Sequence, residues 1–301
     1  MESVRLGDSD LEVSRVGLGC NNFGGRIGFD ETRAVVDAAL EAGVTFFDTA
    51  EIYGKGGESE RSLGQILEKR RGDVVLATKF GWGSGATGDG SADAVRAAIV
   101  GSLERLRTDY VDLYYLHKPD PATPVAETLH ALDELVTAGT VRAIGVCNVS
   151  AEQLAEADRV ARKLGTSRFV VVQNEYSLLE RDDDADVLPL CRELGISYVP
   201  YFPLASGLLT GKYRRGEPAP EGTRLAGREI PDERLQRVEA VAEFAKERGR
   251  TLLELAISAL ASIPGMGSII AGATKPEQVR ANVAASGLRL TTAELDELAT
   301  V

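Results

Sequence analysis

Cysteine is scarce in this sequence, and its spacing excludes two common small-protein architectures. Cys20, Cys147 and Cys191 lie far apart in a chain of 301 residues and form no CxxC pair. Disulfide frameworks and zinc fingers require closely spaced pairs or sets of such residues. The cysteines therefore predict a reducing, cytoplasmic location, and we expect no metal site.

Long hydrophobic runs and an excess of positive charge are also missing. No apolar run approaches the ~20 residues that span a bilayer, and the opening MESVRLGDSD lacks the apolar core of a signal peptide. The 34 lysines and arginines are outnumbered by 46 aspartates and glutamates, which gives a formal net charge of -12. Because nucleic acids and anionic membranes bind basic surfaces, neither is an expected partner. An anionic ligand has to be bound by a local group of residues.

Strand-like and helix-like segments alternate along the whole chain. Eight short runs rich in β-branched and aromatic residues read as strands, at 16–20, 45–49, 74–80, 111–117, 141–147, 169–174, 197–202 and 268–270. Between them lie segments with apolar residues at helical spacing, such as 29–43. Uniformly apolar strands joined by helical crossovers pair in parallel. Eight such units favour a (β/α)8 TIM barrel over an open doubly wound sheet, and we assign residues 1–301 to a single domain.

Two segments depart from this repeat. Residues 5–14, RLGDSDLEVS, have short strand-like pieces around a turn, which predicts an N-terminal β-hairpin across the lower mouth of the barrel. Residues 205–231 are rich in glycine, proline and charge. Connections of this length in a compact domain are usually functional or disordered. We interpret the segment as a lid among the long loops of the C-terminal face.

Ionisable side chains follow successive strands. Asp48 ends the second strand, and Tyr53 lies in the glycine-rich turn beyond it. Lys79 lies near the end of the third strand and His117 at the end of the fourth. Because barrel active sites form at the carboxyl ends of the strands, we expect these four side chains to meet at one mouth.

The four side chains together describe a proton donor aimed at a developing alkoxide. A tyrosine has a reference pKa of about 10, and a nearby ammonium lowers that pKa. We expect Lys79 to act on Tyr53 in this way, with Asp48 keeping the lysine charged. A histidine at 117 can donate a hydrogen bond to a substrate oxygen.

Each of these residues also has a purely structural interpretation. Asp48 alone could bond the amides of its turn, and Tyr53 alone could be a packing residue. Lys79 could be a solvated charge or a Schiff-base lysine, and His117 could cap the turn at Pro119. Their combination at successive strand ends favours the catalytic interpretation.

Six segments of the sequence resemble the aldo-keto reductase superfamily. FFDTAEIYG, VLATKFG and LYYLHKPDP are similar to its catalytic segments, and AIGVCNVS, VVQNEYSLLERD and VPYFPLASGLLTGKY to its cofactor-binding strands. The resemblance runs from about Leu6 to the final helix and is to the long-loop branch, which includes bacterial aldo/keto reductases and potassium-channel beta subunits. It implies a TIM-barrel reductase that binds a nicotinamide cofactor without a Rossmann domain. By resemblance Tyr53 is the general acid, tuned by Asp48 and Lys79, and His117 orients the carbonyl.

The resemblance also assigns cofactor contacts on the later strands. Tyr201 corresponds to the aromatic residue that stacks on the nicotinamide, and Asn148 and Gln173 to residues that bind its carboxamide. Cys147 stands where the family usually has serine. Further assigned residues are Phe202, Pro203, Leu204, Ser206, Gly207 and Lys212. Since Phe202 replaces a small polar residue, we expect the pyrophosphate to be bound by backbone amides from Leu204 onward, because proline has none. The alternative is that LASGLLTG is simply a flexible loop.

The segment IIAGATKPEQVRANVAA ends the last strand and begins a helix, with Pro276 suited to its first position. Helix amino termini attract anions. By resemblance this is the site of the adenosine 2′-phosphate and the adenine, with assigned contacts at Gly272, Thr274, Lys275, Gln278 and Asn282. Relatives committed to NADPH often have lysine and arginine in place of the residues at 272 and 278. NADPH is the expected cofactor, with NADH tolerated. Helix capping beside a solvated lysine is the alternative interpretation.

These assignments predict an enzyme that transfers a hydride from NADPH to an aldehyde or ketone, and that oxidises an alcohol in reverse. Phe23 and Trp82 are expected to line a pocket for apolar or aromatic carbonyl substrates, although Trp82 could equally be a packed surface aromatic. The chain is expected to be a monomer or a homo-oligomer. Two other functions stay open. One is an NADPH-binding regulatory subunit that reports redox state to another protein, and the other is an aldolase that uses Lys79 as a Schiff base.

Overall fold

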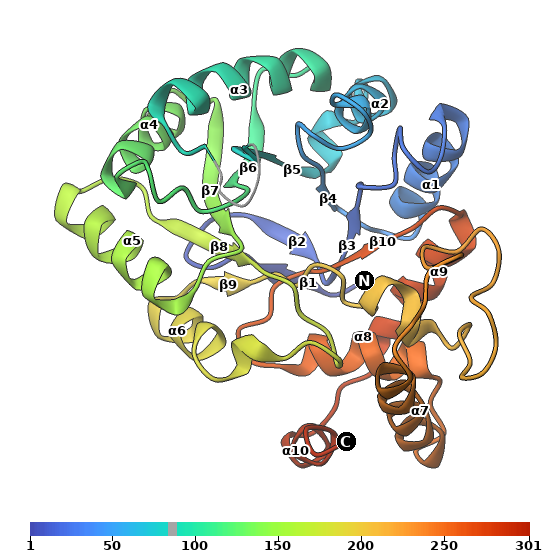
Figure 1. The fold of residues 1–301 in the computed structure, drawn as a ribbon. Coiled ribbons are helices and arrows are strands. Elements are labelled where there is room, and N and C mark those ends of the chain that lie inside the picture. The colour runs from blue at the N-terminus through green and yellow to red at the C-terminus, as the bar shows by residue number, and fades with distance from the viewer. Residues whose placement is uncertain (84–88) are drawn as a thin grey trace.

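A parallel sheet curled into a barrel forms the centre of the molecule. The structure is a computed structural model that describes residues 1–83 and 89–301. In these residues eight parallel strands form one sheet, with the order β10-β3-β4-β5-β6-β7-β8-β9, and helices surround it (Figure 1). The strands are β3 (Val16–Gly19), β4 (Phe46–Asp48), β5 (Val75–Phe80), β6 (Val111–Leu116), β7 (Val141–Cys147), β8 (Phe169–Gln173), β9 (Ser197–Tyr198) and β10 (Ile269–Gly272).

The two ends of the sheet approach each other beside β9. The amide of Tyr198 donates to the carbonyl oxygen of Gly265 at 3.0 Å, and the amide of Gly267 donates back to Tyr198 at 2.8 Å. These bonds join β9 to the segment just before β10. The curled sheet with intervening helices confirms the predicted (β/α)8 TIM barrel.

Strand β9 is shorter than the predicted 197–202. Pro200 lacks an amide hydrogen and cannot continue a regular ladder. Tyr201 nevertheless forms an isolated bridge with Glu175, the second residue after β8. The chain beyond β9 therefore stays beside β8 and carries its side chains to the upper mouth.

Helices follow the strands along the chain and lie around the outside of the barrel. They are α1 (Phe29–Glu41), α2 (Glu58–Leu67), α3 (Ala92–Leu106), α4 (Val125–Thr137), α5 (Ala151–Leu164), α6 (Val187–Leu194), α7 (Asp232–Glu247), α8 (Leu252–Ser262), α9 (Pro276–Ala284) and α10 (Thr292–Leu298). Reciprocal capping boxes begin several of them, for example between Ser150 and Gln153 at α5 and between Thr251 and Glu254 at α8. Helices α3, α4, α6, α8 and α9 contact the strands directly, whereas α7 packs on α8 and on the 3-10 segment η3 (Ala205–Thr210).

An amino-terminal hairpin closes the lower end of the barrel. Strands β1 (Ser3–Arg5) and β2 (Glu12–Ser14) pair antiparallel, which confirms the predicted hairpin. Leu6, Leu11 and Val13 pack in the same buried cluster as the residues inside the barrel. The Gly7 amide donates to Ser197 Oγ at 2.8 Å, at the amino end of β9. The barrel is therefore accessible from its other end, where the strands terminate.

The predicted long connection lies between β9 and α7. It begins with the 3-10 segment η3 (Ala205–Thr210), and the rest of it runs beside α9 in Figure 1. The described part of the chain contains no helix with both the length and the apolar character needed to cross a membrane.

Candidate active site

The four predicted catalytic residues meet at the carboxyl end of the barrel. Asp48 is the last residue of β4, Lys79 belongs to β5, and His117 directly follows β6. Tyr53 lies in the turn between β4 and α2. This turn needs glycine at position 54, because the backbone there has φ +72° and an added Cβ would lie 2.2 Å from a carbonyl oxygen of the neighbouring loop.

Lys79 and Asp48 form a buried ion pair beneath the cavity. The lysine side chain is inaccessible to solvent, and its ammonium donates to Asp48 Oδ1, to the carbonyl oxygen of Thr49 at 2.9 Å and to Tyr53 Oη at 3.3 Å. The second oxygen of Asp48 accepts a hydrogen bond from Gln173 Nε2 at 2.9 Å. Burial acts to lower the pKa of Lys79, but the charge of Asp48 outweighs it and the pKa is raised. Lys79 is therefore an ammonium at neutral pH.

The pKa of Tyr53 differs from the expectation. Burial raises it above the ordinary tyrosine value, and the nearby charge of Lys79 offsets this effect only in part. The prediction of a lowered pKa is wrong for the protein in this form, because it counted the charge and not the desolvation. The consequence is that Tyr53 carries its proton at neutral pH and can donate it.

His117 is neutral and faces the cavity. Burial and the charges of Lys79 and Lys118 lower its pKa to about 2. Among the described residues, its buried Nδ1 has no hydrogen-bond partner. The ring packs edge-on against Tyr53, with 5.8 Å between centroids, and against Trp82, with 4.6 Å. A neutral imidazole beside the Tyr53 hydroxyl can orient a polar group without competing for its proton.

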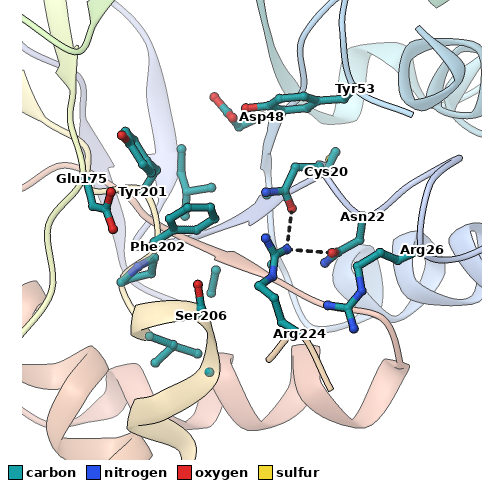
Figure 2. Close-up of a pocket in the computed structure, with 18 of the residues that line it drawn as sticks. Cys20, Asn22, Arg26, Asp48, Tyr53, Glu175, Tyr201, Phe202, Ser206 and Arg224 are labelled. Atoms are coloured by element: carbon teal, nitrogen blue, oxygen red, sulfur yellow. Dashed lines mark hydrogen bonds between the residues drawn. The ribbon is translucent and has the colours of Figure 1, made fainter. Parts of the chain in front are cut away.

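A large cavity opens above these residues. Its volume is about 1280 Å³, larger than the roughly 300–1,000 Å³ of a typical small-ligand pocket. Figure 2 shows Asp48 and Tyr53 on one side of the cavity and Tyr201, Phe202 and Glu175 on the other. The predicted residues that line it are Asp48, Tyr53, Trp82, His117, Asn148, Gln173, Tyr201, Phe202, Pro203, Leu204, Ser206, Gly207, Lys212, Gly272, Thr274, Lys275, Gln278 and Asn282.

Phe23 does not belong to this site. Its side chain is fully buried in the main hydrophobic core, outside the set of residues that line the cavity. The β3–α1 loop instead presents Asn21 and Asn22 to the cavity. The prediction that Phe23 binds substrate is therefore wrong, because an apolar side chain at the start of this loop turns toward the core.

The residues predicted to bind a carboxamide are already bonded to one another or to the ion pair. Tyr201 Oη donates to Asn148 Oδ1 at 2.8 Å, and Asn148 Nδ2 donates to the His117 carbonyl oxygen at 2.9 Å. Gln173 donates to Asp48, as described above. Cys147 is buried beside them, and burial raises the pKa of its thiol, so it is neutral. The polar side chains at the floor of the cavity are therefore hydrogen-bonded to neighbouring residues and are not free.

The start of η3 presents backbone and small side chains to the middle of the cavity. Phe202, Ala205 and Ser206 have φ values between +47° and +59°, which turn the chain sharply. The amides of Ala205 and Gly207 donate to the carbonyl oxygens of Phe202 and Leu204, each at 2.8 Å. Those two amides are therefore engaged within the turn, and the expected run of free donors from Leu204 onward is interrupted at both.

The amino terminus of α9 lies at the far end of the cavity. Pro276 occupies its first position, as expected. Gln278 Oε1 accepts hydrogen bonds from the Thr274 amide at 2.7 Å and from its hydroxyl at 3.2 Å. Lys275 is exposed beside them, whereas Asn282 is buried. Gln278 therefore bonds back to the residue before the N-cap, and Lys275 supplies a cation at this end.

Two arginines that the sequence did not single out line the cavity. Arg224 in the long connection donates to Asn22 Oδ1 at 2.8 Å, as Figure 2 shows. It also donates to Asn21 Oδ1 at 3.2 Å. Arg26 donates to the carbonyl oxygen of Gly222 at 3.1 Å. These bonds fasten the connection across the cavity to the β3–α1 loop. The sequence does show two adjacent asparagines and an arginine in a long loop. It gives no indication that these residues form hydrogen bonds with one another.

A comparison with known protein families agrees with this geometry. The model that describes the aldo/keto reductase family matches residues 15–301. The chain belongs to the aldo/keto reductase family. This member of the family is accordingly an NAD(P)-dependent oxidoreductase that acts on carbonyl compounds.

Similar proteins of this family carry several descriptions. A probable voltage-gated potassium channel subunit beta of Oryza sativa subsp. japonica is 38% identical over 300 residues, covering 95% of this chain and 91% of the relative. The aldo-keto reductase YhdN of Bacillus subtilis is 36% identical over 320 residues, covering 100% and 93%. An NADH-specific methylglyoxal reductase of Escherichia coli is 36% identical over 321 residues, covering 98% and 96%. Likeness alone therefore leaves the choice between NADPH and NADH open.

Proposed function

We propose that this chain is an NADPH-dependent aldo-keto reductase that reduces aldehydes or ketones with Tyr53 as the general acid, and that oxidises alcohols in reverse. The observation that carries the proposal is the contact between Tyr53 Oη and the ammonium of Lys79 at the floor of a large cavity. A protonated phenol, a fixed cation and a neutral imidazole together stabilise an oxygen that is gaining negative charge.

The residues of the chain divide this work. Tyr53 donates its hydroxyl proton to the substrate oxygen. Lys79 then stabilises the phenolate that remains, and Asp48 holds Lys79 in place and charged. His117, with an unbonded Nδ1 at the cavity wall, positions the carbonyl oxygen near Tyr53. Trp82 packs on His117 and forms the outer wall for the substrate.

We place a nicotinamide dinucleotide along the cavity, and the cavity volume of about 1280 Å³ supports this placement. When bound, such a cofactor supplies the hydride. Tyr201 and Phe202 offer rings near the catalytic residues, and Ser206 and Arg224 lie midway. Lys275 at the start of α9 and Lys212 offer cations for phosphate groups. We propose NADPH because exposed lysines suit an additional phosphate, with NADH tolerated because Gln278 is neutral.

The same proposal extends to the whole chain. Residues 1–301 act as one barrel domain, either as a monomer or as a homo-oligomer, in the cytoplasm. The free state of Cys20, Cys147 and Cys191, all buried, supports a reducing compartment. Small carbonyl compounds are the substrates, and neither nucleic acid nor membrane is a partner.

A second candidate function is a regulatory subunit that binds NADPH and turns over slowly. The likeness to probable potassium channel beta subunits of rice and of Arabidopsis thaliana favours it. The two functions differ in turnover rather than in binding. Repeated rapid turnover with a panel of aldehydes supports the enzyme, whereas tight cofactor binding with one slow turnover supports the subunit.

One experiment tests the proposal directly. The purified protein is titrated with NADPH and with NADH while the fluorescence of Trp82, the single tryptophan of the chain, is recorded. Steady-state reduction of the aldehyde panel is then measured with the wild type and with Tyr53→Phe. Binding of a dinucleotide with turnover that depends on Tyr53 is expected. Full activity in Tyr53→Phe would remove the role assigned to that hydroxyl.

A further inference from the structure

The side chain of the buried residue Asn174, next to the candidate active site, makes three hydrogen bonds. Asn174 follows β8, and only 7% of it is exposed. Its Oδ1 accepts from the Val149 amide at 3.1 Å, and its Nδ2 donates to the Val149 carbonyl oxygen at 2.9 Å. The second hydrogen of Nδ2 is donated to Asp183 Oδ2 at 2.8 Å. Three of the four hydrogen bonds that an asparagine amide can make are thus formed with buried or half-buried partners.

The bonds to Val149 control the residue before it. Asn148 has φ +58°, a left-handed conformation that asparagine tolerates but does not prefer. The side chain of Asn148 bonds to Tyr201 Oη and to the His117 carbonyl oxygen. Two hydrogen bonds to the adjacent peptide groups therefore hold this turn in place. They support, from the following peptide, the turn from which the Asn148 side chain reaches these two partners.

The main chain of Asn174 controls the other partner. Its carbonyl oxygen accepts from the Tyr201 amide at 3.0 Å. Asn174 thus contacts the backbone on both sides of the hydrogen bond between Asn148 and Tyr201. A shift of Asn174 would move both residues at once.

Asp183 fixes which way the Asn174 amide points. It belongs to the short 3-10 segment η2 (Asp182–Asp184). Its Oδ2 also accepts from Tyr198 Oη at 2.7 Å, on the strand where the barrel closes. Because a carboxylate only accepts hydrogen bonds, the NH₂ group of Asn174 must face it, which leaves Oδ1 for the Val149 amide.

We infer that Asn174 and Asp183 form a positioning pair that holds Asn148 and Tyr201 in the geometry needed to bind the nicotinamide end of the cofactor. This inference rests on the proposed function. It assigns the pair no contact with the reacting atoms. The bonds of Lys79 to Tyr53, Asp48 and Thr49 do not involve either residue, so proton donation stays intact when the pair is disrupted.

The test uses a swap of the two polar groups. Asn174→Asp removes the donors and puts two carboxylates side by side, so NADPH is expected to bind about tenfold more weakly, as is typical of a lost buried hydrogen bond. Asp183→Asn alone keeps an acceptor for Asn174 and should change affinity little. The double variant N174D/D183N restores a donor between the two positions. Its affinity is expected to exceed that of N174D by at least about threefold without reaching that of the wild type, because the bond between the pair forms again while the Val149 carbonyl oxygen still lacks its donor.

A matched control comes from the same turn. Asp184→Asn removes an equal charge from η2, but Asp184 accepts from Tyr176 and Arg181 rather than from Asn174. Its affinity for NADPH is expected to equal that of the wild type. At saturating cofactor, N174D should keep a kcat within about twofold of the wild type and an unchanged pH profile, since proton donation is separate.

The outcomes separate the inference from the proposed function. A wild type that binds neither dinucleotide overturns both. A wild type that binds NADPH while N174D binds it equally well overturns only the inference. The inference also falls if N174D loses affinity and the swap recovers thermal stability without recovering affinity. If N174D does not fold, Asp183→Ala decides, because it leaves the bonds to Val149 intact and Asp183 is itself only half-buried. An unchanged affinity in Asp183→Ala then overturns the pair.

Discussion

Lys79 Nζ lies 3.3 Å from Tyr53 Oη while it also donates to Asp48. The lysine is completely buried, so its charge is not screened by water at this distance. The phenol itself keeps its proton because burial raises its pKa more than the lysine lowers it. The cation therefore acts mainly on the phenolate that forms during the reaction and less on the resting state.

Removal of the Tyr53 hydroxyl should abolish most of the reduction activity and leave cofactor binding intact. General acids contribute about 10²–10⁴-fold to rate, so kcat of Tyr53→Phe is expected to fall by about that factor. The check is steady-state kinetics with one aldehyde, together with the NADPH titration. Tyr110→Phe is the matched control, because that residue is outside the set that lines the cavity. A fall in kcat of equal size in the control would contradict the assignment.

Breaking the buried ion pair from one side should destabilise the fold. Lys79→Met leaves the carboxylate of Asp48, only 3% exposed, without its cation. The free energy of unfolding is expected to fall by about 3–5 kcal/mol, as it does when one member of a buried pair is removed. Equilibrium denaturation in urea measures it. The double variant K79M/D48N removes both charges and should regain much of the lost stability; no recovery would mean that the charge of Asp48 is not the cause.

Carbonyl reduction should lose activity at alkaline pH and should show no loss near pH 6.5. A proton donor works below its pKa, so activity is lost as the pH rises through the pKa of Tyr53. Burial raises that value, so the loss begins above about 10, the ordinary tyrosine value. The pKa of His117 is lowered to about 2, so this residue stays neutral and causes no inflection near 6.5. A pH profile of kcat/KM tests this, and an acid limb near 6.5 that disappears in His117→Asn would refute it.

The fastening of the long connection should slow the release of the cofactor. Arg224→Ala removes both hydrogen bonds to the β3–α1 loop and a cation that lies 5.3 Å from the ring centroid of Phe202. Charged hydrogen bonds contribute about 1.5–3 kcal/mol, so NADPH dissociation is expected to accelerate about tenfold or more. Stopped-flow release measures the rate. Arg228→Ala, an exposed arginine in the same connection, is the control and should release NADPH at the wild-type rate.

The cation at the start of α9 should decide the preference between the two dinucleotides. Lys275 lines the cavity beside Thr274 and Gln278, so Lys275→Met removes a positive charge from the end assigned to the 2′-phosphate. Affinity for NADPH is expected to fall about fivefold to tenfold, and affinity for NADH to stay the same, since NADH has no such phosphate. Parallel titrations with both dinucleotides provide the internal control. An equal loss for both would place Lys275 elsewhere along the ligand.

Much of the fold could be predicted from the sequence because the strand and helix periods are strong and regular. The eight strands, the hairpin and the carboxyl-end location of Asp48, Lys79 and His117 all follow from these local patterns. The end of β9 could not be placed, because residues beyond Pro200 keep some bonds to β8 without forming a regular ladder. Such irregular pairing depends on the partner strand and not on the local pattern.

The candidate site was harder to predict where the result depends on the direction in which a side chain turns or on how deeply it is buried. The sequence predicts Phe23 as a residue of the substrate pocket, but it does not say which way a loop residue turns. The pKa of Tyr53 depends on how deeply it is buried, which no spacing reveals. The bonds from Arg224 to Asn22 and from Asn174 to Val149 link segments far apart or around a turn. Only the folded chain brings such groups together.

The hairpin that closes the lower end of the barrel also determines when the protein can finish folding during synthesis. Leu6, Leu11 and Val13 leave the ribosome before the strands that they cover, yet Gly7 bonds to Ser197, and Arg15 bonds to the carbonyl oxygen of Met266. The first segment must therefore remain exposed, or be sheltered by a chaperone, until nearly the whole chain has emerged. Nascent chains that stop before Ser197 should present this apolar segment to solvent and bind chaperones, whereas the finished chain hides it.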